Sequence, residues 1–269
     1  MILLLNNILA VRSEAAPVSD LWAFWQPEPA PLSESKTQAP ISHELWQQLL
    51  DRYLSAAEDQ INRFDYQAVT AADRALLARY LDTLTSLDPR GYPIDEQMAY
   101  WINLYNALTV QVVLDNPNKN SIVDMGAGWF KFGPWDDKLV TLTGQPITLN
   151  DIEHRILRPI WQDRRIHFAV NCASLGCPNL SAQAFTSTNL ESMLAAAESA
   201  YLNHPRGVSF NGKDELVLSS IFKWYVEDFA ADRAQLLEYL SQHHATLAAQ
   251  LVNYAGPIRY QYDWSLNQP

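Results

Sequence analysis

Residues 96–114 read EQMAYWINLYNALTVQVVL, and this stretch decides how the rest of the chain can fold. Its apolar residues cover nearly the whole circumference of a helix, which is the pattern of a helix buried on all sides. Asp95 can cap its start, and Asp115-Asn116-Pro117 ends it, because proline cannot continue a helix. We therefore expect a central buried helix with the other elements packed around it.

Shorter helices and strands are expected on both sides of this helix. Helical spacing of apolar residues predicts helices that begin at Ser42, at Thr70 and at Thr148 or Asn150, and further helices over 189–201, 221–229 and 233–254. Strand-like runs occur at 139–142, 165–171, 208–210 and 215–219, and Asn211-Gly212 predicts a hairpin between the last two. The expected fold class is α+β: one mainly helical domain with a small antiparallel sheet.

The first 42 residues differ in composition from the rest. Residues 1–11, MILLLNNILAV, precede the small residues Ser13 to Ala16, so residues 1–16 resemble a weak secretory signal, although no basic residue comes first. Residues 17–42 hold five prolines, which is typical of an extended tether, and Leu21 to Trp25 within it are apolar enough to dock. We expect 43–269 to form one domain of a periplasmic or secreted protein, with a cytoplasmic protein as the alternative.

The charge of the chain limits the partners that it can bind. Its 30 acidic and 19 basic residues give a net charge of −11, which argues against nucleic acid and anionic lipid as main partners. No apolar run is long enough to span a bilayer. We expect a small-molecule, peptide or protein ligand, and the sequence indicates no cofactor.

One face of the central helix carries polar side chains. Glu96, Tyr100, Asn103 and Asn106 follow helical spacing, and polar groups on so apolar a helix must bind partners or line a cavity. We predict that Glu96 and Asn103 meet His167 in one cavity, with Asn106 as a binding residue beside them. The alternative is that these side chains bind the backbone of loops.

Residues 167–178, HFAVNCASLGCP, hold both cysteines of the chain. Cys172 is a candidate nucleophile, because an imidazole such as His167 or loop N–H groups can favour the thiolate. On a strand the two side chains would face opposite ways, so the strand must end before Cys172. A disulfide to Cys177, a buried structural cysteine, and a zinc site with His154 and His167 are the alternatives.

Two further segments contribute candidate binding residues. The glycines of residues 126–134, GAGWFKFGP, let the backbone turn sharply, and Trp129 and Phe130 are too apolar to remain in water. We predict an ordered loop that borders the cavity. His154, on the helix that begins near Asn150, is a candidate as well, whereas Glu153 beside it is expected to point elsewhere.

Four segments, in this order, resemble the bacterial family named domain of unknown function 547 over about residues 85–230: YWINLYNALTVQVVL (100–114), DIEHRILR (151–158), RIHFAVNCASLGCPNL (165–180) and FKWYVEDF (222–229). A buried helix followed by a strand that begins His-Phe-Ala also resembles papain-like and transglutaminase-like thiol enzymes at the level of fold. In those enzymes a cysteine opens the helix, but no cysteine lies near Glu96. The resemblance thus implies that Cys172 or Cys177 replaces that cysteine, that Glu96 performs different chemistry, or that the site is inactive.

Two hypotheses of function follow. The first is a thiol-dependent hydrolase or transferase acting on an amide or ester, with Cys172 as nucleophile, His167 as general base, and Glu96 with Asn103 as orienting or oxyanion groups. The second is a non-catalytic binding domain on the same kind of scaffold, in which the aromatic residues Trp129, Phe130, Phe132 and Trp135 contact a partner.

Overall fold

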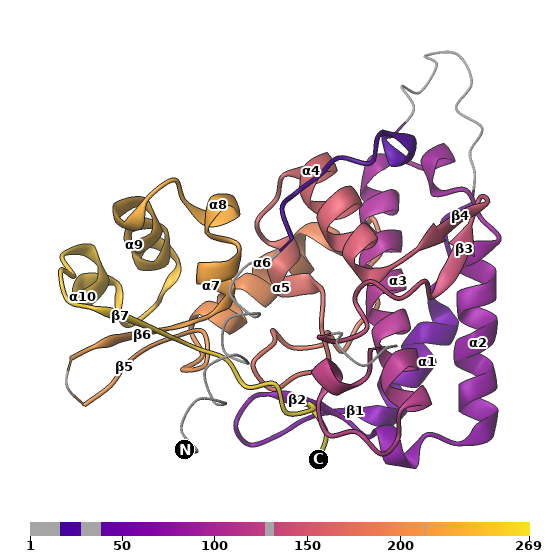
Figure 1. The fold of residues 1–269 in the computed structure, drawn as a ribbon, viewed down its shortest axis with the longest axis horizontal. Coiled ribbons are helices and arrows are strands. Elements are labelled where there is room, and N and C mark those ends of the chain that lie inside the picture. Colours follow the sequence, from indigo (N-terminus) through magenta and orange to yellow (C-terminus); the bar gives the residue numbers. More distant parts are fainter. Residues whose placement is uncertain (1–16, 28–38, 127–131, 213) are drawn as a thin grey trace, which may run out of the picture.

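Helix α3 (Ile94–Asp115) is the central element of the fold (Figure 1). The structure is a computed structural model, and it describes residues 17–27, 39–126, 132–212 and 214–269. Almost every residue of α3 is buried, which confirms the prediction of a helix enclosed on all sides. The predicted cap is wrong, because Pro93 takes the cap position and Asp95 lies in the first turn, where its charge still favours the positive end of the helix dipole.

The larger hydrophobic core surrounds α3. Helices α1 (Glu44–Tyr53) and α2 (Ala71–Thr85) pack against each other, and α2 packs on α3. Thr70 caps α2 as predicted, since its hydroxyl accepts a hydrogen bond from Asp73 N at 3.1 Å. His43 occupies the cap position of α1 without a side-chain cap bond, and Ser42, one residue earlier, accepts a hydrogen bond from Glu44 N at 3.4 Å. Two short antiparallel ladders complete this part: β1 (Leu54–Ala56) with β2 (Asn62–Phe64), and β3 (Val140–Leu142) with β4 (Gln145–Ile147).

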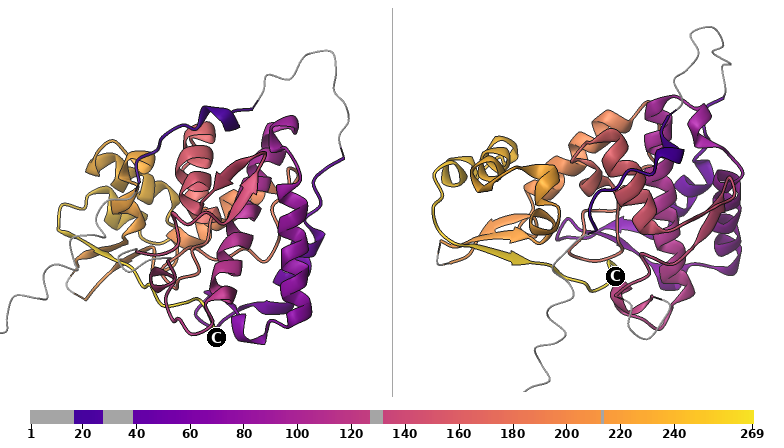
Figure 2. Two further views of the ribbon diagram at one scale, coloured as in Figure 1. Left: turned by 45° about the vertical axis from the view of Figure 1, so that its right-hand side comes forward. Right: turned by 45° about the horizontal axis from the view of Figure 1, so that its top comes forward.

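A second, smaller core lies to one side of the first, as both views of Figure 2 show. Strands β5 (Val208–Phe210) and β6 (Leu216–Ser219) form the antiparallel hairpin predicted from Asn211-Gly212. Strand β7 (Ile258–Gln261), which was not predicted, pairs with β6 in parallel. The predicted closing helices are shorter pieces: α7 (Ile221–Trp224), α8 (Val226–Phe229), α9 (Arg233–His243) and α10 (Ala248–Val252).

The segment between the two cores departs from the prediction. A π-helix, η5 (Asp151–Leu157), runs into α4 (Arg158–Trp161), and α6 (Leu190–Leu202) is a helix as expected. The strand predicted over 165–171 is wrong, because His167 lies on the short helix α5 (Ile166–Ala169). The backbone that follows α5 is extended, but it pairs with the side chain of Asn106 and not with another strand. His167 therefore does not open a strand as it would in a papain-like enzyme.

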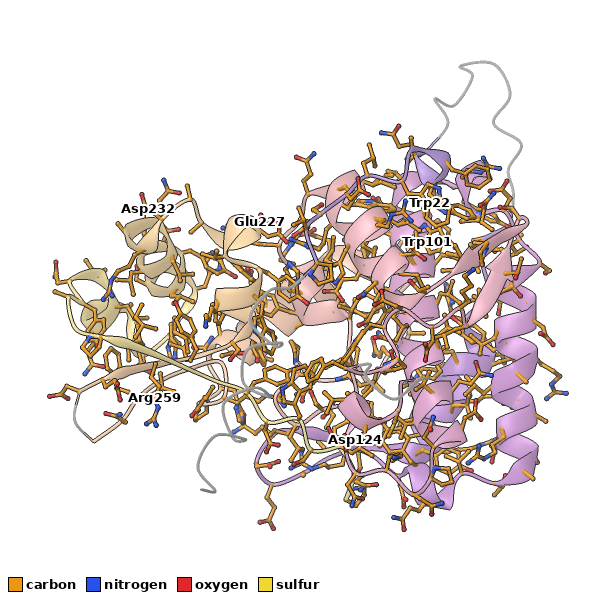
Figure 3. The ribbon with its side chains drawn as sticks, in the orientation of Figure 1. Trp22, Trp101, Asp124, Glu227, Asp232 and Arg259 are labelled. Carbon is orange, nitrogen blue, oxygen red and sulfur yellow. The ribbon has the colours of Figure 1, made fainter. Side chains whose placement is uncertain are left out.

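The N-terminal segment docks along η5 as its apolar composition predicts. The backbone N–H groups of Asp20 and Trp22 donate to the carbonyls of His154 and Arg155 at 3.0 and 2.9 Å. Trp25 is fully buried between Trp22 and Trp101, which lie at the same end of α3 (Figure 3). The expected signal, residues 1–16, lies outside the described residues. Within the described residues every helix is too short or too polar to cross a bilayer.

Candidate active site

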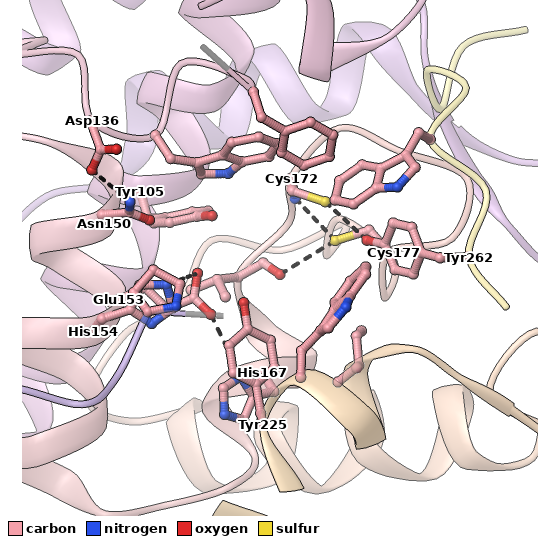
Figure 4. A pocket seen from close by; sticks show the side chains of 17 residues that line it. Tyr105, Asp136, Asn150, Glu153, His154, His167, Cys172, Cys177, Tyr225 and Tyr262 are labelled. Atoms are coloured by element: carbon pink, nitrogen blue, oxygen red, sulfur yellow. Dashed lines mark hydrogen bonds and ion pairs between the residues drawn. The ribbon is translucent and has the colours of Figure 1, made fainter. Parts of the chain in front are cut away.

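A cleft of about 310 Å³ lies where the two cores meet (Figure 4). Its walls come from α3, η5, α5, the loop that holds both cysteines, the segment at α7, and the last residues of the chain. Three kinds of side chain line it: two thiols, a cluster of ionisable groups, and a wall of aromatic rings. The thiols and the ionisable cluster lie on different sides of the cleft (Figure 4).

Both cysteines are free thiols in this cleft. Cys172 is partly exposed, whereas Cys177 is buried. The sulfur of Cys172 lies 3.1 Å from the hydroxyl oxygens of both Ser174 and Tyr262. The backbone N–H of Cys172 donates to the sulfur of Cys177 at 3.0 Å. The disulfide between them, one of the alternatives for this pair, is therefore not formed in the structure.

The two thiols have opposite tendencies to ionise. Hydrogen bonding from the Cys177 thiol, together with the hydroxyls of Ser174 and Tyr262 and the N–H of Ser174, lowers the pKa of Cys172 against the opposing effect of burial. Burial raises the pKa of Cys177 well above its ordinary value. Since a thiolate is the nucleophilic form of cysteine, Cys172 is the thiol that this environment prepares for reaction.

A strained turn positions Cys172. The next residue, Ala173, has a φ of +60°, a left-handed conformation that costs a non-glycine residue about 1–2 kcal/mol. Two hydrogen bonds hold it there: Ala173 N donates to Asn171 Oδ1 at 2.8 Å, and Asn267 N donates to Ala173 O at 3.0 Å. Strain of this kind is common beside reactive groups, because it fixes a side chain in one orientation.

The C-terminal tail supplies the hydroxyl of Tyr262. Residues 263–267 run beside the cysteine loop, where Leu175 N donates to Ser265 O and Gly176 N donates to Asp263 O, both at 2.8 Å. A Cβ at Gly176 would lie 2.7 Å from the backbone nitrogen of Asp263, so this close approach requires glycine. The tail and the loop together place the Tyr262 hydroxyl against the Cys172 sulfur.

On the other side of the cleft Glu153 lies between two imidazoles. Its carboxylate oxygens are 3.5 Å from Nδ1 of His167 and 4.0 Å from Nε2 of His154. Nε2 of His167 contacts Asp228 Oδ2 at 2.6 Å, and the same oxygen accepts a hydrogen bond from Arg158 Nε at 2.6 Å. The ring of His167 also stacks on Tyr225, with ring centroids 4.2 Å apart.

These contacts fix the charges of the cluster. Burial alone would raise the pKa of Glu153 and of Asp228, but the neighbouring histidines and Arg158 outweigh it and hold each pKa at about 2. Burial opposes the charge on His167, yet the hydrogen bond to Asp228 and the nearby charge of Glu153 raise its pKa. Burial lowers the pKa of His154 to about 4. At neutral pH both carboxylates are ionised and His154 is neutral, while the imidazolium of His167 is more stable than that of a free histidine.

The polar residues of α3 do not gather in this cleft. Glu96 Oε1 accepts a hydrogen bond from Ile41 N at 2.6 Å, so this carboxylate anchors the segment before α1. Asn103 binds both backbone groups of Phe185, at 2.7 and 3.0 Å. The predicted convergence of Glu96 and Asn103 with His167 is therefore wrong. A buried polar group needs a partner, but the sequence does not say which partner it finds.

Asn106 has a comparable role next to the site. Its amide donates to Ala169 O at 3.0 Å, and its carbonyl accepts from Asn171 N at 2.8 Å. The alternative of amides that bind loop backbone thus describes Asn103 and Asn106. Asn106 still bears on the site, because the backbone that it clamps leads directly from His167 to Cys172.

Aromatic rings form the third part of the lining. Phe132, Trp135 and Trp264 contact one another, with ring centroids 5.4 to 5.8 Å apart. Tyr262 and Trp224 continue this wall beyond Trp264, at 4.5 and 5.5 Å from it. Residues 127–131, with the candidates Trp129 and Phe130, lie outside the described residues, but Phe132 and Trp135 beside them do border the cleft.

Several lining residues were absent from the candidates drawn from the sequence. Glu153 was expected to point away from His154, but both residues line the cleft from the π-helix, and π-helical segments are frequent at functional sites. Tyr225, which lines the cleft, and Asp228, which contacts His167, lie in FKWYVEDF, so that motif could have indicated them. Tyr262 and Trp264 carry no signal, because their place depends on how the tail packs.

Metal ligation receives no support from the described part of the chain. Among these residues no group of three or more His, Cys, Asp and Glu side chains is arranged to hold a metal ion. The alternative that the two cysteines bind zinc with His154 and His167 therefore has no matching cluster there.

Residues 89–202 match the model of a family described as protein of unknown function, DUF547. This part contains three of the four motifs quoted above, and the match supports the resemblance inferred from them. Curated proteins and solved structures gave no significant match.

Proposed function

We propose that this chain is a thiol-dependent hydrolase or transferase that acts on an amide or ester, with Cys172 as its nucleophile. The observation that carries the proposal is the state of Cys172: a free thiol in a cleft, with hydroxyl groups 3.1 Å from its sulfur and a lowered pKa. The strained turn at Ala173 adds support, since it holds the thiol in one position.

The first chemical step forms a covalent acyl-enzyme. Cys172 releases its proton to water, and the thiolate sulfur bonds to the carbonyl carbon of the substrate. The carbonyl oxygen becomes an oxyanion, for which the hydroxyl of Tyr262, itself hydrogen-bonded by Ser174 at 3.0 Å, is our candidate donor. The bond to the amine or alcohol then breaks and leaves a thioester on Cys172. Water or an acceptor nucleophile attacks the thioester and restores the thiolate.

His167 is our candidate for the proton transfers of this cycle. Its raised pKa favours the imidazolium, which can donate a proton to the leaving amine or alkoxide and then accept one from the attacking water. Asp228 holds Nε2, while Nδ1 lies 3.5 Å from Glu153 and has no hydrogen-bond partner among the described residues. Nδ1 is therefore the nitrogen that remains available. His167 acts here first as an acid, although the sequence alone suggested a base.

A non-catalytic binding domain is the second candidate. It is favoured by one observation, which is that the hydrogen bonds of Cys172 go to Ser174 and Tyr262, and those of His167 go to the carboxylate cluster. In most thiol enzymes the two side chains would contact each other. The aromatic wall would then serve a ligand that the protein holds without changing it.

Trapping of an acyl-enzyme separates the two candidates. We would incubate the full chain with p-nitrophenyl acetate, stop the reaction in acid, and measure the intact mass and the acetylated peptide. The enzyme hypothesis predicts one acetyl group on Cys172 and its loss in Cys172→Ala. Cys177→Ala is the matched control, and it should retain acetylation at Cys172 at a lower rate. Equal acetylation of the natural chain and Cys172→Ala would leave the binding domain as the better account.

A further inference from the structure

The described residues that line the cleft include two carboxylates and no lysine or arginine, and His167 offsets part of the charge of Glu153 beside it. The two carboxylates are Glu153, which is 6% exposed, and Asp136 at the rim. The Glu153 oxygens have their nearest partners at 3.5 and 4.0 Å, which is at or beyond the limit of a hydrogen bond. Nδ1 of His167 faces the same gap without a hydrogen-bond partner in the described residues, so this end of the cleft has unused capacity for a polar ligand.

The aromatic wall of the cleft has the shape of a corner. The rings of Phe132 and Trp264 meet at 89°, and those of Trp135 and Trp264 meet at 66°. Tyr262 adds a third ring at 53° to Trp264, with centroids 4.5 Å apart. Phe132 and Trp135 lie nearly parallel, at 26°, so the corner is where this pair meets the rings of Trp264 and Tyr262, and it presents several ring faces and edges to one compact group. Aromatic corners of this kind attract alkylammonium groups through the negative charge of the ring faces.

We propose that the cleft recognises a substrate with a small alkylammonium group, which the aromatic corner holds and the negative charge of the cleft carboxylates attracts. One part of this proposal rests on the proposed function, namely that the molecule carrying the alkylammonium group is the substrate of Cys172. Tyr262 connects the two parts, because its ring belongs to the corner and its hydroxyl lies 3.1 Å from the Cys172 sulfur. A cation in the corner thus places the adjoining ester or amide carbonyl next to the thiol.

A pair of probes that differ only in charge tests this recognition without any turnover. Choline carries a trimethylammonium group, and 3,3-dimethylbutan-1-ol is its neutral counterpart of nearly the same shape. We would titrate each into the full, reduced chain and follow tryptophan fluorescence and binding heat. We expect choline to bind at least about fivefold more tightly than the neutral alcohol. Raising the salt concentration should weaken choline binding alone.

Variants locate the bound group. Trp264→Leu should weaken choline binding at least about threefold, whereas Trp161→Leu, which changes a tryptophan outside the cleft, should leave it unchanged. Asp136→Asn changes an exposed side chain, so it should fold normally, and it should also weaken choline binding. The proposal is overturned if both probes bind equally, if the neutral one binds more tightly, or if choline fails to saturate by about 50 mM. Since no probe is turned over, each of these outcomes leaves the acyl-enzyme result unaffected.

Discussion

Hydroxyl groups, and not an imidazole, surround the sulfur of Cys172. Hydrogen bonding from Cys177, and then from Ser174 and Tyr262, lowers the pKa of Cys172 and so favours the charged form of the thiol, which burial opposes. In the proposed mechanism the site therefore differs from a cysteine–histidine pair, because the thiolate would form without proton transfer to His167. The ionisation of Cys172 can then be tested separately from proton transfer by His167.

Removal of one hydroxyl should change the ionisation of Cys172 and little else. Tyr262→Phe keeps the ring and loses the donor 3.1 Å from the sulfur, so the pKa of Cys172 should rise. We expect the pH midpoint of alkylation by iodoacetamide to move upward by about one pH unit. Tyr260→Phe, on β7, is the matched control and should leave the midpoint unchanged. Identical midpoints in both variants would show that Tyr262 does not stabilise the thiolate.

Among the residues predicted from the sequence, the nucleophile and general-base candidates lie in the cleft. Cys172 and His167 both line it. Their partners could not be predicted, because the Cys172–Tyr262 contact joins residues 90 positions apart. Glu96 was misjudged for a related reason, since its need for a partner was evident and the partner itself, the N–H of Ile41, was not.

At the scale of elements, α3 holds two loops through two similar asparagine clamps. Asn103 fixes the backbone at Phe185, and Asn106 fixes the backbone between α5 and Cys172. Both side chains are fully or almost fully buried, so each substitution leaves two backbone groups without partners. The two clamps differ in that only Asn106 supports the cysteine loop.

This difference gives a matched pair of variants. Asn103→Ala and Asn106→Ala should each lower the free energy of unfolding by about 2–5 kcal/mol, because an unpaired buried group costs about 1–3 kcal/mol. Only Asn106→Ala should also shift the alkylation midpoint of Cys172, under conditions where both variants remain folded. Denaturant unfolding and alkylation measured on the same samples check this. A shift of similar size in Asn103→Ala would mean that the loop responds to general loss of stability.

The elements themselves were predictable to different degrees. The apolar circumference of α3 and the Asn211-Gly212 hairpin are strong local signals, and both features were predicted correctly. The segment 165–171 gave a misleading signal, since a short alternating run fits a strand as well as it fits a four-residue helix such as α5. The π-helix η5 and the parallel pairing of β7 with β6 depend on contacts that no local pattern encodes.

At the scale of the whole molecule, the stability of the fold should depend on pH through buried histidines. His43 is 5% exposed, its Nδ1 lies 2.7 Å from the Tyr80 hydroxyl oxygen, and it is not among the residues that line the cleft. Burial lowers its pKa to about 4, against a raising effect from Glu96. In the unfolded chain the pKa is near 6.5. Between about pH 4 and pH 6.5, His43 is therefore mostly protonated in the unfolded chain and mostly neutral in the folded chain.

This difference in the pKa of His43 makes the folded state less stable in acid. Below about pH 6.5 the unfolded state binds a proton that the folded state does not, so stability falls with falling pH, by about 2 kcal/mol at pH 5 for His43 alone. His43→Gln should remove this part of the pH dependence. Denaturant unfolding of both chains at pH 7 and pH 5 measures it. His167 has a raised pKa and acts in the opposite direction, but it contributes equally to both chains. Parallel losses of stability in the two chains would contradict the argument.

The most direct test of Cys172 as the nucleophile is the rate of its alkylation by iodoacetamide in the natural chain between pH 5 and pH 10. Peptide mass analysis separates Cys172 from Cys177. We predict that the alkylation rate of Cys172 reaches half its maximum at a pH below about 8.5, the ordinary pKa of a cysteine thiol. Buried Cys177 should not be labelled while the protein is folded. A midpoint at or above that value, or recovery of an intact Cys172–Cys177 disulfide from native protein, would contradict it.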